Sequence, residues 1–197
     1  MENMSELDSL IVLNIGDLDA VATRINALGY RLWKDIAEQA ESWAEGPGWF
    51  GHFETDEVWL APDEWRQPED EPIGWFYFGF GAGDTESLAA GEPYFELSRY
   101  LGEAGGELCL WLHQNAAKSK IWKTSARAMA SELAAAGFSM TDACNFYTRC
   151  SLNREEVSQA LKDEDLTGAL HPVLKALDLA LASIPNFQKL LDKAQNS

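Results

Sequence analysis

The stretch Ile73-Gly-Trp-Phe-Tyr-Phe-Gly-Phe-Gly81 is the most apolar and most aromatic run in this chain of 197 residues. Successive side chains of a β-strand point to opposite faces, so this run would place large apolar groups on both faces. The two sets are Ile73, Trp75 and Tyr77 on one face, and Phe76, Phe78 and Phe80 on the other. A strand with two apolar faces must be covered on both. We therefore expect residues 73–80 to form the central strand of a sheet.

Other segments fit neighbouring strands. Residues 49–53 and 57–61 flank a polar turn and predict a hairpin. Residues 107–113 alternate leucines with other side chains, and 144–149 would make a fifth strand. The short apolar run Leu10–Ile15 is interpreted as an edge strand or a segment docked on the core.

Segments with helical periodicity precede and follow these strands in the sequence. It predicts a helix from Asp17, as N-cap, to Glu45, and Gly29 either divides this helix or lies within it. Further helices are predicted over residues 93–102, 120–136 and 170–183, with a short last helix after Pro185. Ser119 would be the N-cap of the helix over 120–136, and Gly137 would follow its end. Another helix would begin after Asn153, which would form a capping box with Glu156.

Strands that cluster centrally between helices indicate the α+β class rather than alternating βαβ units. We expect a mainly antiparallel sheet of about four to five strands, flanked by long helices and followed by a helical C-terminal tail. Residues 1–150 would form the core domain. Residues 151–197 would be a helical segment packed on that core, without independent stability.

The composition indicates the cellular environment of the protein. No apolar run reaches the roughly 20 residues of a membrane-spanning helix, and the first residues lack the features of a secretory signal. Cys109, Cys144 and Cys150 are odd in number and widely spaced, which argues against a disulfide framework. We therefore expect a cytoplasmic protein without membrane contact.

The negative charge is concentrated in one part of the chain. The net charge is −17, and residues 35–98 hold sixteen acidic side chains against a single basic one, Arg66. This third of the chain accounts for −15, which would repel nucleic acid and anionic membranes and attract basic proteins. The only basic cluster is Lys118, Lys120, Lys123 and Arg127, which would pair with the acidic part or contact an anion.

Signatures of catalysis are sparse. The spacing Gly79-x-Gly81-x-Gly83 after a strand resembles the first motif of class I methyltransferases, although Tyr77 stands where that family has an acidic residue. The resemblance implies a nucleotide or S-adenosyl site at this strand exit, and the structural alternative is a glycine-rich end of a strand. His52, His113 and His171 show no metal-ligand spacing, so we expect neither a metal nor a resident cofactor.

The preferred hypothesis is a non-catalytic protein that binds and blocks a basic partner, such as a nuclease, a toxin or a nucleic-acid-binding complex. Carboxylates would stand in for phosphates, and a tryptophan in the proline-rich loop 62–72 would anchor the contact. The predicted partner-binding residues are Glu54, Asp56, Glu57, Asp63, Glu64, Trp65, Glu69, Asp70 and Glu71. The alternatives are a small-molecule enzyme using residues 79–83, a structural subunit of an assembly, or acids that only solubilise the surface.

Overall fold

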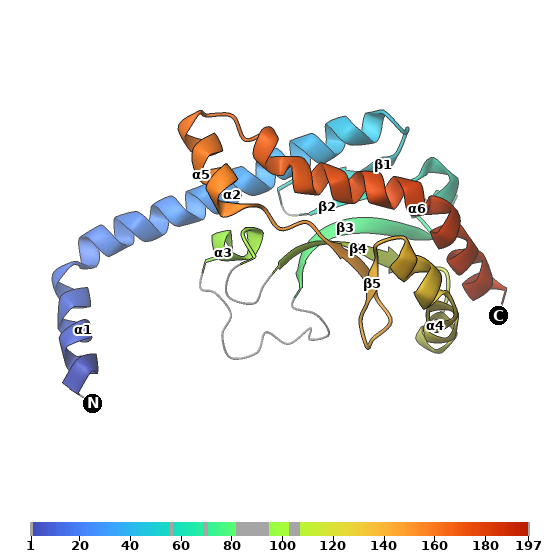
Figure 1. Ribbon diagram of the computed structural model, residues 1–197, viewed down its shortest axis with the longest axis horizontal. Helices are drawn as coiled ribbons and strands as arrows, with labels where there is room; N and C mark the ends of the chain where they lie inside the picture. Colours follow the sequence, from blue (N-terminus) through green and yellow to red (C-terminus); the bar gives the residue numbers. More distant parts are fainter. Residues whose placement is uncertain (1, 56, 69–70, 82–94, 103–106, 197) are drawn as a thin grey trace.

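The computed structural model describes residues 2–55, 57–68, 71–81, 95–102 and 107–196 (Figure 1). Its six strands form one antiparallel sheet in the order β1-β2-β3-β4-β6-β5, so the α+β class and the antiparallel pairing are confirmed. The strands are β1 (Phe50–Phe53), β2 (Val58–Ala61), β3 (Gly74–Gly81), β4 (Glu107–Gln114), β5 (Ser139–Met140) and β6 (Phe146–Arg149).

Helices α2 and α6 lie across one face of the sheet, and α4 packs against α6 (Figure 1). The helices are α1 (Glu2–Leu13), α2 (Ile15–Glu45), α3 (Leu97–Tyr100), α4 (Ser119–Ala135), α5 (Arg154–Lys162) and α6 (His171–Gln195), with short 3-10 turns η1 (Asp63–Trp65) and η2 (Gly168–Leu170). None of the described helices combines the length and the apolar character needed to span a bilayer.

The aromatic stretch forms β3, which pairs with β2 on one side and with β4 along its whole length on the other. Phe76 on its helix-covered face is fully buried and contacts the rings of Trp49, Trp65 and Phe187 at centroid distances of 5.7, 5.8 and 5.3 Å. Aromatic contacts of this kind add to the stabilisation from buried apolar area. The core of the molecule therefore lies between this face and helices α2 and α6.

The second face of β3 is covered less completely than we expected. Trp75 and Tyr77 are half-buried, and within the described residues no helix crosses this face. Their cover comes instead from side chains of the neighbouring strands: Trp111 and Tyr147 are each 8% exposed and form a second small cluster with Tyr77 and Cys109. A strand can thus be apolar on both faces when the sheet supplies its own lateral aromatic cover.

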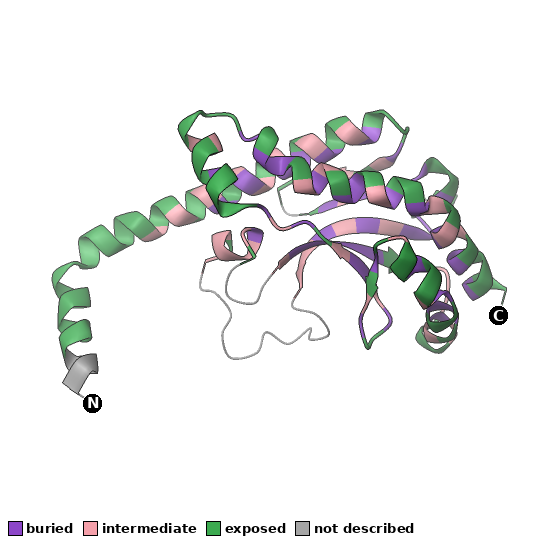
Figure 2. Ribbon diagram, in the orientation of Figure 1, coloured by how far each residue is buried: buried purple, intermediate pink, exposed green. Residues whose placement is uncertain are grey.

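The N-terminal segment differs most from expectation. The run Leu10–Ile15 is no strand: it ends α1 and begins α2, which starts at Ile15 rather than at Asp17. Leu18 and Val21, expected in the buried stripe of this helix, are 44% and 55% exposed. The stripe is buried only from Leu32 onward, because the first turns of α2 extend beyond the sheet (Figure 2).

Several element boundaries also needed correction. Gly29 lies inside the continuous helix α2, and Pro185 does not stop α6, which runs through it to Gln195. The helix predicted over 93–102 is described only at Leu97–Tyr100. Lys118 rather than Ser119 occupies the N-cap position of α4, whereas Gly137 follows that helix with a φ of +95°, as predicted. The strand β5 was not expected and raises the strand number to six.

Candidate functional site

The predicted acidic residues that the structure describes are all exposed. Glu54 and Glu57 lie at the turn of the β1–β2 hairpin, and Asp63 and Glu64 lie at the other end of β2, in η1. Glu71 follows in the same loop, which is closed by hydrogen bonds between Gln67 and Glu71 and between Ile73 and Trp65. Asp56, Glu69 and Asp70 lie outside the described residues. The acids therefore flank β2 at both of its ends.

Trp65 is not available to a partner, so its predicted role as a binding anchor is wrong. The side chain is fully buried, stacks on Phe76, and its Nε1 donates a hydrogen bond of 2.7 Å to Oε1 of Gln188 in α6. The proline-rich loop gave no indication of this contact, because Gln188 lies 123 residues further along the chain. Trp65 instead holds the loop against α6.

A third group of acids extends the surface along α2. Glu38, Glu41 and Glu45 are exposed on the C-terminal half of this helix, which packs beside β1 and β2. Because β1 is an edge strand of the sheet, α2 and the hairpin together present acidic side chains at this edge of the molecule. We call the described acids Glu38, Glu41, Glu45, Glu54, Glu57, Asp63, Glu64 and Glu71 the acidic edge.

Few cations of the protein itself neutralise the acidic edge. Arg66 pairs with Asp63 at 3.0 Å and Lys34 with Glu38 at 3.3 Å, and both are exposed pairs of neighbours on one turn. Pairs of this kind contribute about 0–1 kcal/mol. In the part of the chain that the structure describes, no ion pair joins the basic cluster of α4 to the acidic edge. Most carboxylates of the acidic edge therefore form no ion pair with another described residue and can meet a partner's cations.

An aromatic row on the second face of the sheet went unnoticed in the sequence. Directly paired positions on five successive strands place aromatic rings side by side. The row consists of His52, Trp59, Tyr77, Trp111 and Tyr147. Alternation of large side chains within each strand hinted at it, but only the strand order and register bring the five together.

The row continues into Trp75, whose ring stacks on His113 at 4.3 Å and lies 6.4 Å from that of Trp59. Partial burial lowers the pKa of His113, which keeps this imidazole neutral near pH 7. Trp59 and Trp75 are half-buried, so their rings still offer surface between the two ends of β2. Such rings can accept the guanidinium or ammonium groups of a basic protein.

The glycines of the predicted nucleotide-binding turn have a packing role. Gly79 and Gly81 lie inside β3, and Gly83 lies outside the described residues. A Cβ atom at Gly81 would approach Cζ2 of Trp111 to 2.2 Å, well inside any normal contact. The ring of Trp111 therefore explains the glycine at position 81 without a ligand.

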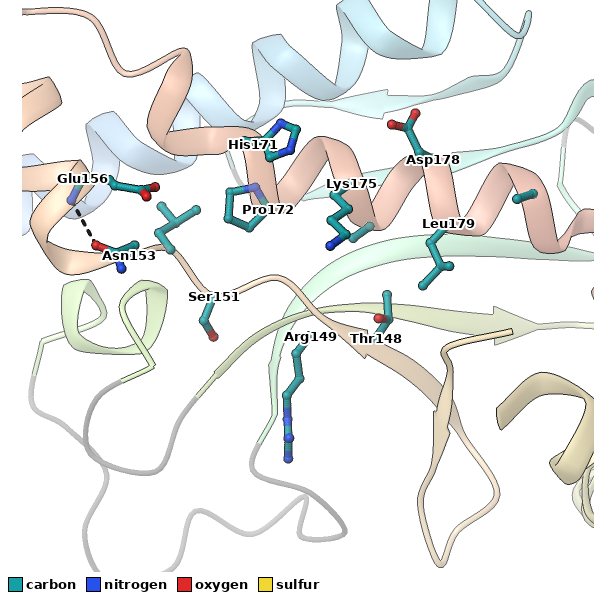
Figure 3. Close-up of a pocket in the computed structure, with 13 residues that line it drawn as sticks. Thr148, Arg149, Ser151, Asn153, Glu156, His171, Pro172, Lys175, Asp178 and Leu179 are labelled. Carbon is teal, nitrogen blue, oxygen red and sulfur yellow. Dashed lines mark hydrogen bonds between the residues drawn. The ribbon is translucent and has the colours of Figure 1, made fainter. Parts of the chain in front are cut away.

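A cavity of about 1000 Å³ lies between α6, the end of β6 and the start of α5 (Figure 3). Three of the polar side chains that line it already have partners. Asn153 caps α5, and Asp178 accepts a hydrogen bond from Trp43. Arg149 pairs with Glu107 and extends away from α6. The cavity is also lined by Thr148, Ser151, Glu156, His171 and Lys175, and the buried hydroxyl of Ser151 has no hydrogen-bond partner among the described residues. No hydrogen bond joins the side chains of Ser151, His171, Lys175 and Glu156 to one another, so we assign no reaction to this cavity.

The described residues also offer neither a metal-binding group nor a reactive thiol. These residues contain no group of three His, Cys, Asp or Glu side chains that could hold a metal ion. Burial raises the pKa of the Cys109 thiol to about 12 and raises that of Cys150 well above its ordinary value. Both thiols are therefore protonated and unreactive near neutral pH.

A scan against protein-family models and searches of curated proteins and of solved structures found no match to this chain.

Proposed function

We propose that this protein is a non-catalytic binding protein whose acidic edge occupies the basic site of a partner protein. The observation that carries the proposal is that the acidic edge is exposed and that, among the described residues, its ion pairs are the exposed contacts of Asp63 with Arg66 and of Glu38 with Lys34. An uncompensated cluster of like charge destabilises the folded chain through self-repulsion. A cationic partner would relieve that repulsion.

Electrostatic attraction would act both before and after contact. The potential of the acidic edge reaches about 8–10 Å at physiological ionic strength, so it would steer a basic surface toward β1 and β2. In the complex, the carboxylates would take the places of nucleic-acid phosphates in the partner's site. Trp59 and Trp75 are partly buried, and they replace Trp65 as the proposed aromatic contacts.

The chemistry of the site defines the class of partner. A protein that normally binds phosphates, such as a nuclease, a toxin with a nucleic-acid target or a nucleic-acid-binding complex, carries the cationic surface that these carboxylates fit. Inhibition would follow from competition, because the same cations cannot bind both ligands. The three free, buried cysteines suit a reducing compartment, and we place the interaction in the cytoplasm.

The test uses charge reversal at the acidic edge. The variant Asp63→Lys/Glu64→Lys/Glu71→Lys changes the charge by the same amount as the control Glu156→Lys/Asp163→Lys/Glu164→Lys near α5, remote from β2. Partners would be captured from native cell extract at low salt, released at high salt, identified, and titrated with both variants. We expect at least tenfold weaker binding for the first variant and little change for the control. Equal affinities of the two variants would refute the acidic edge as the binding surface.

A further inference from the structure

Residues 2–24 form a helical arm that projects from the body of the molecule (Figure 1). We call α1 and the first turns of α2, up to Arg24, the N-terminal arm. Its large apolar side chains are exposed to an unusual degree (Figure 2). They are Leu7 at 52%, Leu10 at 57%, Ile11 at 40%, Val12 at 72%, Leu13 at 77%, Ile15 at 60%, Leu18 at 44% and Val21 at 55% exposed.

Part of this apolar surface belongs to a regular stripe that the body covers only at one end. Within α2, apolar residues recur at alternating steps of three and four, a spacing typical of helices that pack along one another. The positions are Leu18, Val21, Ile25, Leu28 and Leu32; Leu7 and Ile11 add exposed apolar side chains on α1, which a turn at Asn14 separates from α2. Leu32 is fully buried against the body, whereas the positions before Ile25 have no cover in the described chain. The stripe therefore continues an existing packing surface beyond the part that one chain can bury.

Charge along the arm indicates what covers it. Residues 1–23 contain five acidic side chains and no lysine or arginine, whereas residues 24–34 contain Arg24, Arg31 and Lys34 and no acid. Arg31 and Lys34 also pair with Asp35 and Glu38 at 4.0 and 3.3 Å, respectively. If the arms of two copies packed in parallel, the acidic residues of one arm would lie beside the acidic residues of the other. In opposite directions, the acidic half of each arm lies beside the basic segment of the other, and opposite charges across a helix pair favour that orientation.

We propose that the N-terminal arm is a dimerisation element, in which the arms of two copies of this chain pair in antiparallel orientation through Leu18 and Val21 of the stripe and through Leu7 and Ile11 of α1. The contact is isologous, since each copy uses the same surface. An anionic lipid surface is disfavoured as the occupant by the absence of basic residues before Arg24. The proposal is independent of the acidic edge, which lies at the other end of α2.

The first experiment measures mass by sedimentation equilibrium across a range of protein concentrations. We expect a reversible dimer for the native chain and at least a tenfold higher dissociation constant for Leu18→Asp. The matched control is Thr23→Asp, which adds the same charge on the opposite face of α2 at another exposed position. Neither residue belongs to the buried core, so both variants should fold, as circular dichroism would verify.

A native chain that remains monomeric at all concentrations would overturn the proposal. So would a dimer that Leu18→Asp and Thr23→Asp affect equally. Flotation with vesicles of anionic and of zwitterionic phospholipid adds a further check: a monomer that binds vesicles through the arm would also contradict self-pairing.

The second experiment tests the orientation. Asp8→Cys and Arg24→Cys introduce exposed thiols into a chain whose own described cysteines are all buried, so background crosslinking is low. An antiparallel pair predicts that a mixture of the two variants forms mixed disulfide dimers faster than either variant alone. Rapid crosslinking of each variant with itself, without preference for the mixture, would exclude the antiparallel arrangement.

Discussion

At the scale of single residues, the hydrogen bond between Trp65 and Gln188 fixes the loop that carries Asp63 and Glu64. Gln188 also donates through Nε2 to Asp192 at 2.7 Å, so its Oε1 is oriented toward the indole. We expect Trp65→Phe to lower the free energy of unfolding by about 1–3 kcal/mol, because the substitution leaves a partly buried acceptor without its donor. Urea denaturation would measure the loss.

The matched control for this prediction is Trp43→Phe. Trp43 donates a comparable hydrogen bond of 2.9 Å to Asp178, but this bond is exposed, so water can replace the lost donor. Its loss should therefore cost less than that of the Trp65 bond. If the two variants were equally destabilised, burial of the Trp65 bond would not be the cause.

The buried thiols predict how stability depends on alkaline pH. The pKa of Cys109 is raised to about 12, first by burial and then by the nearby Glu107, and that of Cys150 is raised by burial. A group whose pKa is raised by folding stabilises the folded state below its unfolded pKa, near 9, and this contribution disappears as the pH rises toward 12. Each thiol would contribute a decline of up to about 1.4 kcal/mol per pH unit in that range.

The measurement is a series of urea midpoints between pH 7 and pH 10.5 for the native chain and for Cys109→Ala. Lysines and tyrosines also titrate in this range, so the comparison between the two chains isolates the thiol. The variant should be less stable at pH 7 and should lose stability more gradually above pH 9. Parallel curves would show that Cys109 is not protected in the folded state.

The sequence could assign residue types to this surface but not their exposure. Glu54, Glu57, Asp63, Glu64 and Glu71 are exposed as their charge predicts. Trp65 was assigned wrongly, because its burial depends on a contact with α6 that no local pattern encodes. The aromatic row was missed for the same reason, since it depends on strand register.

At the scale of elements, the start of α5 is a local structure that the sequence specifies well. The side-chain oxygen of Asn153 accepts hydrogen bonds from the backbone N–H groups of Glu155 and Glu156 at 2.9 and 3.1 Å. Asn153→Ala should lower the free energy of unfolding by about 1 kcal/mol, within the 0.5–2 kcal/mol range of such caps. Thermal melts would measure it, and Asn153→Asp should restore the cap; an alanine variant as stable as the native chain would contradict its role.

Elements with strong local signals were predicted correctly, and those set by tertiary packing were not. The hairpin β1–β2, the strands β3 and β4 and the cap of α5 follow from alternation and capping chemistry. Pro185 normally interrupts a helix. Here α6 continues through it, because Phe187, Leu190 and Leu191 beyond the proline are fully buried in the core. The N-terminal run Leu10–Ile15 was ambiguous, since a short apolar segment fits either a strand or a helix.

At the scale of the whole molecule, the C-terminal segment completes the core. Val173, Leu177, Ala180 and Phe187 of α6 are fully buried, and Phe187 contacts the ring of Phe76 in the central strand. A chain that ends at residue 150 would expose this face of the sheet to water. We expect it to show no cooperative thermal transition by circular dichroism or calorimetry.

A chain that lacks residues 1–14 is the control for this truncation. These residues make few contacts with the body, so the shortened chain should still melt cooperatively. Cooperative melting of residues 1–150 alone would instead show that the first 150 residues form an independent domain, with the C-terminal helices only attached to it.

The contacts of Trp65 also bear on how fast a partner protein could bind near Asp63 and Glu64. Trp65 is locked to α6, and its carbonyl accepts the N–H of Ile73 at 2.9 Å, so the backbone beneath Asp63 and Glu64 is set when folding ends. A colliding protein would meet a backbone at Asp63 and Glu64 that is already in its final position. No conformational search then delays productive collisions, and capture at this corner would be governed by diffusion and ionic strength.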